Sequence, residues 1–310
     1  MELPPTPQVS AAEIDTALRP LRIAVISFEA RESGGTHVCL AMAKALMAKV
    51  PGSTLDEHYN VWHQTRQATW EKMWPEGMEP DIIIAEGPHF PTRIRDKYPF
   101  IVDRDDYEKY KNFEPTISHL PFIDKAKESA RFKKYYPAFA RPLIAVCAAY
   151  DKDETLWQKM ENIISRYEKG TVFLTSSPRT DKDEFENTAR LAGELAKAKP
   201  DLQFLSYAYQ SGRAYNPYHG LLLNADVIVL CDRSDSMLAD ARSTNATIYV
   251  NDRDEQNLGP YCNVPELYEF NGELPIAARV VSDSTKEVAQ EILQNYRQWL
   301  KKGGPEYGPE

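Results

Sequence analysis

Three polar side chains follow directly on a short apolar run in the second half of the chain. Arg233, Ser234 and Ser236 come within five residues of the run Val227–Cys231. Hydroxyls and a guanidinium are donors that bind phosphate groups in proteins. A helix that begins here would add free backbone N–H groups and the positive end of its dipole. The pattern indicates a phosphate site, and the alternative is a plain helix N-cap at Ser234 or Asp235.

The residues around this turn predict the elements that would hold it. A helix is expected to end at Ala225-Asp226, a buried parallel strand to span 227–231, a helix to span 237–243 and a further strand to span 247–250. Consecutive parallel strands are joined by right-handed crossovers. In open α/β sheets, ligands bind beyond the carboxyl ends of the strands, which is where the polar turn lies.

A similar turn follows another apolar run. The run 171–175 predicts a strand, and Ser177, Arg179 and Thr180 come directly after it, ahead of a helix predicted over 184–198. An arginine flanked by hydroxyls at a strand end suits phosphate binding. A capped helix start without a ligand is the alternative.

The first half of the chain carries the candidate acid–base groups. A strand over 22–28 leads into a helix over 34–50, and His37 is the titratable residue at the helix start. A buried strand over 80–86 ends in Glu86, with His89 close behind. His37, Glu86 and His89 are therefore candidates for a general base. The alternatives are a solvent-facing histidine and a surface carboxylate.

Composition narrows the class of protein. The 310 residues predict about two domains, and a formal net charge of −9 argues against a broad nucleic-acid-binding surface. The four cysteines are widely spaced, which favours buried free thiols, and no set of metal ligands is evident. We find no signal peptide and no apolar run of about 20 residues. We therefore expect a cytoplasmic protein, and peripheral membrane contact stays open.

Several motifs resemble the mitochondrial-fission (elongated-mitochondria) family, which has a glycosyltransferase-B-like fold. The residues that match in order and spacing are Asn216-Pro217-Tyr218, Ala225-Asp226, Ser234, Ser236-Met237 and Ala241, together with Ser177, Arg179 and Thr180. Some positions depart from the family pattern. Asp240 replaces a glutamate and Arg233 an aspartate, Thr36-His37-Val38 replaces Glu-Asn-Gln, and Ala148–Asp151 replaces a Gly-Gly turn.

The resemblance implies an α/β protein of two Rossmann-like domains facing a cleft, with parallel sheets and helices on both faces. Residues 1–20 would be an N-terminal extension, 21–140 the acceptor domain and 141–284 the nucleotide-sugar donor domain. Residues 285–310 would form a final helix and tail, with the helix packing back on the first domain.

The resemblance also implies a metal-independent glycosyltransferase that moves a sugar from a nucleotide-sugar donor to a hydroxyl acceptor, with no cofactor besides that donor. Ser177, Arg179, Thr180, Arg233, Ser234 and Ser236 would hold the phosphates, and Asn216 and Tyr218 the nucleotide. His37, Glu86 or His89 would be the base. The alternative is a non-catalytic interaction protein, since plant members of the family recruit a dynamin-related GTPase, and the departures at Ala148–Asp151 and at His37 favour it. An enzyme that glycosylates a nucleic-acid base is a third option, which the acidic composition does not support.

Overall fold

The computed structural model describes residues 18–27, 34–58, 74, 78–86, 100–103, 117–118, 120–148, 155–178, 180–211, 214–231, 234–251, 267–270 and 285–302. The chain forms two compact units, which we describe separately. Unit 1 comprises Met1–Tyr110 and Lys286–Glu310, and unit 2 comprises Lys111–Thr285. None of the described helices is long and apolar enough to span a bilayer.

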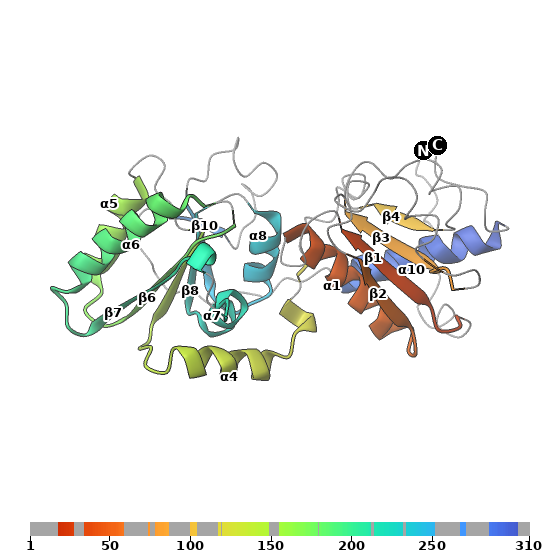
Figure 1. Ribbon diagram of the computed structural model, residues 1–310, viewed down its shortest axis with the longest axis horizontal. Coiled ribbons are helices and arrows are strands. Elements are labelled where there is room, and N and C mark those ends of the chain that lie inside the picture. The colour runs from red at the N-terminus through yellow and green to blue at the C-terminus, as the bar shows by residue number, and fades with distance from the viewer. Residues whose placement is uncertain are drawn as a thin grey trace, which may run out of the picture. The chain divides into compact units, whose positions relative to one another are not determined.

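Unit 1 is built on a parallel sheet of four described strands, in the order β2-β1-β3-β4 (Figure 1). The strands are β1 (Arg22–Ser27), β2 (Thr54–His58), β3 (Ile82–Glu86) and β4 (Ile101–Asp103). Helix α1 (Gly34–Lys49) connects β1 to β2. From β1 the chain adds β2 on one side of the sheet, and then β3 and β4 on the other side. A ligand crevice is expected at this switch point, beyond the carboxyl ends of β1 and β3.

Helix α10 (Thr285–Lys301) packs in unit 1 against Phe100 and Asp81. The ring centroids of Tyr296 and Phe100 are 5.4 Å apart, and Trp299 stacks on Tyr296 at 5.6 Å. The Tyr296 hydroxyl lies 3.4 Å from Asp81 Oδ1. Burial, followed by the Asp81 carboxylate, raises the pKa of Tyr296 to about 12, so the phenol stays protonated and donates this bond.

Unit 2 is built on a parallel sheet of six described strands, in the order β10-β9-β8-β5-β6-β7 (Figure 1). The strands are β5 (Leu143–Cys147), β6 (Gly170–Thr175), β7 (Leu202–Tyr207), β8 (Val227–Leu230), β9 (Thr247–Val250) and β10 (Leu267–Glu269). Counted along the chain, this is the order 3-2-1-4-5-6 of the Rossmann fold, whose switch point lies between β5 and β8.

Helices cover both faces of the unit 2 sheet. They are α4 (Lys125–Tyr135), α5 (Thr155–Arg166), α6 (Lys182–Ala196), α7 (Tyr218–Asn224) and α8 (Asp235–Arg242), with 3₁₀ turns η4 (Leu120–Phe122) and η5 (Tyr209–Ser211). One buried cluster joins α4, α7 and α8 to the sheet through Phe132, Leu221 and Leu238. The other cluster joins α5 and α6 to the opposite face through Met160 and Phe185. Alternate side chains of a parallel strand point to opposite faces, which explains why the central strands β5 and β8 are apolar throughout.

The sequence predicts a strand over residues 58–63, whereas strand β2 spans Thr54–His58. Residues 59–63 lie outside the described residues, so a strand there stays a prediction. β2 contains Asp56 and Glu57, and among the described strands it pairs only with β1. A strand at the edge of a sheet needs no apolar run, so hydrophobic pattern alone could not locate it.

The boundary between the units lies near residue 110 rather than at residue 140. Helix α4 belongs to unit 2, because Phe132 is fully buried in the cluster that also holds Phe173 of β6. The Phe132 and Phe173 ring centroids are 5.9 Å apart. Although α4 precedes residue 140 in the chain, its buried Phe132 side chain ties it to the second sheet.

Candidate functional site

The switch point of unit 2 brings the ends of β5 and β8 side by side. Cys147 is paired with Leu230, and the Cys231 N–H donates to the Cys147 carbonyl at 3.0 Å. Burial raises the pKa of the Cys147 thiol to about 12, so it stays protonated and acts as a small apolar side chain. The turn that contains Ser234 follows β8 directly, so the predicted polar turn lies at the predicted edge of the sheet.

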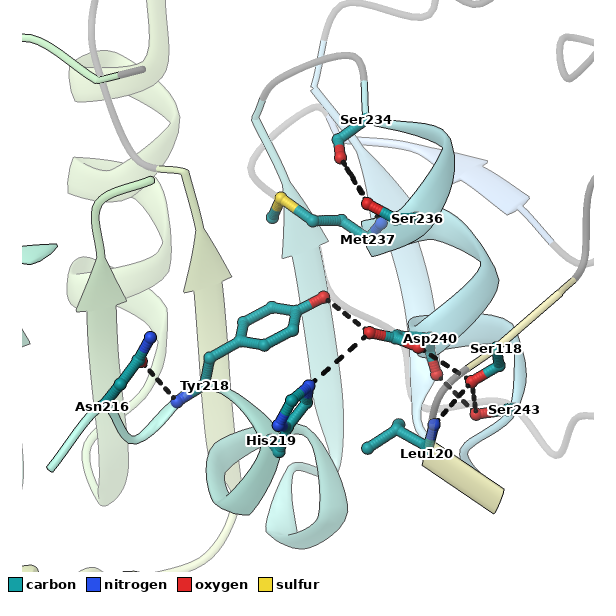
Figure 2. Close-up of polar contacts among 10 residues, drawn as sticks. All are labelled: Ser118, Leu120, Asn216, Tyr218, His219, Ser234, Ser236, Met237, Asp240 and Ser243. Carbon is teal, nitrogen blue, oxygen red and sulfur yellow. Dashed lines mark hydrogen bonds and ion pairs between the residues drawn. The ribbon is translucent and has the colours of Figure 1, made fainter. Parts of the chain in front are cut away.

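Helix α8 begins at this edge, with Ser234 as its N-cap. The Ser234 hydroxyl accepts from the Met237 N–H at a long 3.4 Å and lies 3.2 Å from the Ser236 hydroxyl (Figure 2). Both serines are partly exposed. A weak cap bond is readily exchanged for a bond to an anion, so the cap and the phosphate-site interpretations of Ser234 are compatible.

The turn after β5 starts in a conformation that favours glycine. Ala148 has φ of 55° and is buried. This is the position where the resembling family has its Gly-Gly turn. For a residue with a Cβ, the left-handed region costs about 1–2 kcal/mol. The backbone therefore keeps a glycine-type turn although the side chain has changed.

Changing Ala148 to glycine should leave the free energy of unfolding within about 1 kcal/mol of the parent value. Relief of the left-handed strain offsets the lost methyl burial, about 0.8 kcal/mol, and the greater freedom of the unfolded chain, about 0.4–1 kcal/mol. Ala145→Gly is the matched control, because Ala145 is fully buried in β5, the strand that ends just before Ala148. Without strain to relieve, it should lose about 1–2 kcal/mol. Urea denaturation measures both, and equal losses would contradict a strained turn at Ala148.

Ser177 and Thr180 lie at the carboxyl end of β6, where they bond to each other. The Ser177 N–H donates to Thr180 Oγ1 at 2.8 Å, and the two hydroxyl oxygens are 3.0 Å apart. The start of α6 is already capped, because Asp181 accepts from two backbone N–H groups and Asp183 and Glu184 occupy the first turn. Three carboxylates repel a phosphate from the N–H groups of this helix. The geometry here is that of a capped helix start.

Asn216 and Tyr218 shape the start of α7. Exposed Asn216 accepts from the Tyr218 N–H at 3.1 Å, which forms a local turn. The Tyr218 hydroxyl points toward Asp240 of α8, and its oxygen is 3.4 Å from Asp240 Oδ2 (Figure 2). Burial, followed by the Asp240 carboxylate, raises the pKa of Tyr218 well above its ordinary value. Tyr218 therefore connects α7 to α8.

Asp240 is the centre of a buried polar network that could not be predicted from the sequence. Its Oδ1 atom accepts from the Ser118 hydroxyl at 2.8 Å, and Ser118 Oγ is also 2.9 Å from Ser243 Oγ. The Ser118 N–H donates to Thr285 Oγ1 at 3.1 Å. All four of these residues are buried. The only signal in the sequence was an acidic residue where the family has glutamate.

The imidazole ring of His219 also lies near the Asp240 carboxylate. Its Nε2 atom is 4.0 Å from Asp240 Oδ2 (Figure 2). Burial lowers the pKa of His219 below its ordinary value, while Glu128 acts in the opposite direction. The ring is therefore neutral near pH 7, and its contact with Asp240 is polar rather than a full ion pair.

In unit 1 the structure places His37 and Glu86 near the same edge of the sheet. Glu86 ends β3, where its backbone lies next to Ser27 at the end of β1. The Ser27 hydroxyl is 2.6 Å from Thr36 Oγ1, in the first turn of α1, and His37 is the next residue. His37 is partly exposed. His89, Arg179 and Arg233 lie outside the described residues, so their roles stay predictions.

The family can now be identified. The sequence matches the family model described as mitochondrial fission ELM1 over residues 100–259, which is just over half of the chain. The chain belongs to this family. The match includes every strand from β5 to β9 and the start of α8, so it contains the switch point and its serines. The resemblance stated from the motifs is confirmed. No curated protein matches the sequence.

Solved structures give the fold class. UDP-GlcNAc 2-epimerase from Neisseria meningitidis, bound to UDP-GlcNAc, is similar over 91% of this chain and 92% of its own, with a TM-score of 0.51 and 10% identity. ADP-heptose LPS heptosyltransferase II of E. coli is similar over 91% and 99%, with a TM-score of 0.48 and 13% identity. At such identities a likeness concerns the fold alone. Together with the two parallel sheets, the likeness to the epimerase confirms two Rossmann-like domains.

Proposed function

We propose that this protein is a glycosyltransferase that moves a sugar from a nucleotide-sugar donor to a hydroxyl acceptor. The observation that carries the proposal is the start of α8 at the switch point of unit 2, with Ser234 and Ser236 partly exposed there. Ligands of doubly wound sheets bind at such a point. The free N–H groups of the helix start and the two hydroxyls suit a diphosphate.

In this proposal the donor diphosphate lies against the first turn of α8. Ser236 donates its hydroxyl, Ser234 exchanges its weak cap bond for one to phosphate, and Arg233 supplies a cation. The helix dipole and these donors stabilise the charge that develops on the departing diphosphate, so transfer needs no metal ion at this place. Asn216 and Tyr218, at the start of α7, hold the nucleotide.

The transfer step forms one bond and breaks another at the anomeric carbon. The acceptor oxygen bonds to that carbon, and the bond from the carbon to the diphosphate oxygen breaks. The diphosphate leaves with the bonding electrons. A base takes the proton of the acceptor hydroxyl, and the candidates are His37, Glu86 and His89 of unit 1. The products are a glycoside and a nucleoside diphosphate, with the nucleotide sugar as substrate and no further cofactor.

One similar fold supports a nucleotide-sugar ligand. The Neisseria meningitidis epimerase was solved with UDP-GlcNAc bound. At 10% identity the likeness transfers neither the sugar nor the base, so the donor class is inferred from the shared fold and from the chemistry of the α8 turn.

Thermal unfolding with a panel of nucleoside diphosphates and nucleotide sugars tests the proposal. A ligand at about a hundred times its dissociation constant should stabilise the protein by roughly 2.7 kcal/mol. We expect one nucleotide class to raise the melting temperature, and Ser236→Ala to reduce that rise. No rise with any member of the panel would overturn the donor site.

A non-catalytic role is the second candidate, and the start of α6 favours it. Thr180 and Ser177 satisfy each other there, and Asp181 occupies the helix N-terminus. Ala148 also replaces a glycine of the resembling family. The family carries the description of mitochondrial fission, which suits a protein that binds a partner. Absence of any nucleotide response would support this function, and a search for a bound protein would follow.

A further inference from the structure

Helix α4 is strongly basic, although the chain as a whole has a formal net charge of −9. Its 11 residues include five cations and one carboxylate, Glu128. The five cations are all exposed, and they are Lys125, Lys127, Arg131, Lys133 and Lys134. Such a local reversal of sign on one helix marks a surface that meets a negatively charged partner.

The inner side of α4 is fixed to unit 2, so the outer side is a rigid surface. Phe132 is fully buried, and Ser129 donates to Asn224 of α7 at 3.0 Å. Tyr215 anchors the helix over two turns. Its hydroxyl donates to Glu128 at 2.8 Å, and its ring stacks on Tyr135 with centroids 4.7 Å apart. In Figure 1, α4 runs along the outer side of unit 2.

Little within the described chain neutralises the outer surface. Lys125, Lys127, Lys133 and Lys134 form no ion pair with any described residue. Glu128 is partly buried and turned toward Tyr215, and the N-cap carboxylate, Asp124, accepts from the Lys127 N–H at 2.9 Å. Tyr135 is 50% exposed at the rim of the basic surface. The surface thus combines unpaired ammonium groups with an amphipathic aromatic ring.

We propose that the exposed face of α4 docks on an anionic lipid membrane. Lysines outnumber arginine four to one, and an ammonium is a point charge that suits many lipid phosphates without a fixed geometry. A straight helix on the outside of a domain matches a flat bilayer and needs no groove. An exposed tyrosine is typical of the membrane–water interface. A nucleic acid is less favoured, because the described basic surface has a single exposed ring on which a base could stack.

Sedimentation with vesicles tests this docking surface. The probes are vesicles of phosphatidylcholine alone and vesicles with about one-third phosphatidylserine. Each cation near an anionic surface contributes about 1 kcal/mol, so removing three charges should lower the lipid affinity roughly 100-fold. We expect the parent protein to bind only the anionic vesicles, and the combined variant Lys127→Gln, Lys133→Gln, Lys134→Gln to lose that binding. High salt should also release the protein.

A matched variant separates location from net charge. Lys169→Gln, Lys182→Gln and Lys197→Gln together remove the same three charges from exposed positions elsewhere in unit 2 and should keep vesicle binding. Circular dichroism checks that both variants are folded. Equal binding of the two variants, no binding to anionic vesicles, or tighter binding to single-stranded RNA than to vesicles at the same salt would each overturn the proposal. The test uses no nucleotide sugar, so it is independent of the proposed activity.

Discussion

Replacing Gly220 by alanine should lower the free energy of unfolding by about 2–3 kcal/mol. A Cβ atom at this place in α7 would lie 2.6 Å from Phe132 Cβ and 2.5 Å from the Tyr215 hydroxyl oxygen. Both neighbours are buried, and Phe132 is attached to α4. Helix propensity alone predicts the opposite sign, a gain of up to about 1 kcal/mol. The sign of the change in stability therefore tests the close packing of α7 against α4.

Gly193→Ala is the control for this prediction. Gly193 lies within α6, and an added Cβ would meet a Phe204 ring carbon at 3.5 Å, an ordinary contact. Here the same substitution should stabilise the protein by about 0.5–1 kcal/mol. Urea denaturation of both variants gives the comparison. An increase in the free energy of unfolding in both variants would mean that α7 and α4 are not closely packed at Gly220.

Replacing Asp240 by alanine should lower the free energy of unfolding by about 3 kcal/mol, since it removes the acceptor shared by Ser118 and Tyr218. The hydroxyls that donated to the carboxylate would be left buried without that partner. Because Asp240 lies in α8, four residues after Ser236, nucleotide binding should also weaken. Asp240 is a positioning residue in this account, as its carboxylate oxygens face Ser118, Tyr218 and His219 (Figure 2).

Asp240→Asn separates the polar network from simple packing. The amide keeps the size of the side chain and an acceptor for Ser118, so its loss should stay near 1 kcal/mol. Chemical denaturation measures the stability of both variants. If alanine and asparagine cause equal losses, or if neither lowers stability by more than about 0.5 kcal/mol, Asp240 does not organise the contact between α7 and α8.

Much of the fold could be predicted because its central strands are short apolar runs. The residues of β9 were predicted with their observed bounds, and β6 and β8 within one residue. The strands at the sheet edges could not be predicted from the hydrophobic pattern, for a physical reason. β2 is polar, and β10 has only three residues, too few to show a pattern. The position of α4 depends on burial of Phe132, which the lysines around it in the sequence do not indicate.

The candidate site could be predicted where it depends on local geometry. Ser234 and Ser236 follow a strand directly, so the sequence places them at the sheet edge. The Asp240 network could not be predicted, because Ser118 and Asp240 are 122 residues apart and meet only in the folded unit. The sequence could not decide whether Ser177 and Thr180 bind a phosphate or bond to each other, since a helix cap and a phosphate-binding turn use the same residue types.

The measurement that tests the donor site most directly is a stability titration of Ser236→Ala against Ser165→Ala with the nucleotide that stabilises the parent protein most. Ser165 is exposed on the last turn of α5, which runs back from the carboxyl edge of the sheet. At a hundredfold excess over the parent dissociation constant, parent and Ser165→Ala should each gain roughly 2.7 kcal/mol. Loss of a hydrogen bond to a charged phosphate weakens binding about 10–100-fold, so Ser236→Ala should gain only about 0.4–1.4 kcal/mol. Equal gains in the two variants would contradict a phosphate site at the start of α8.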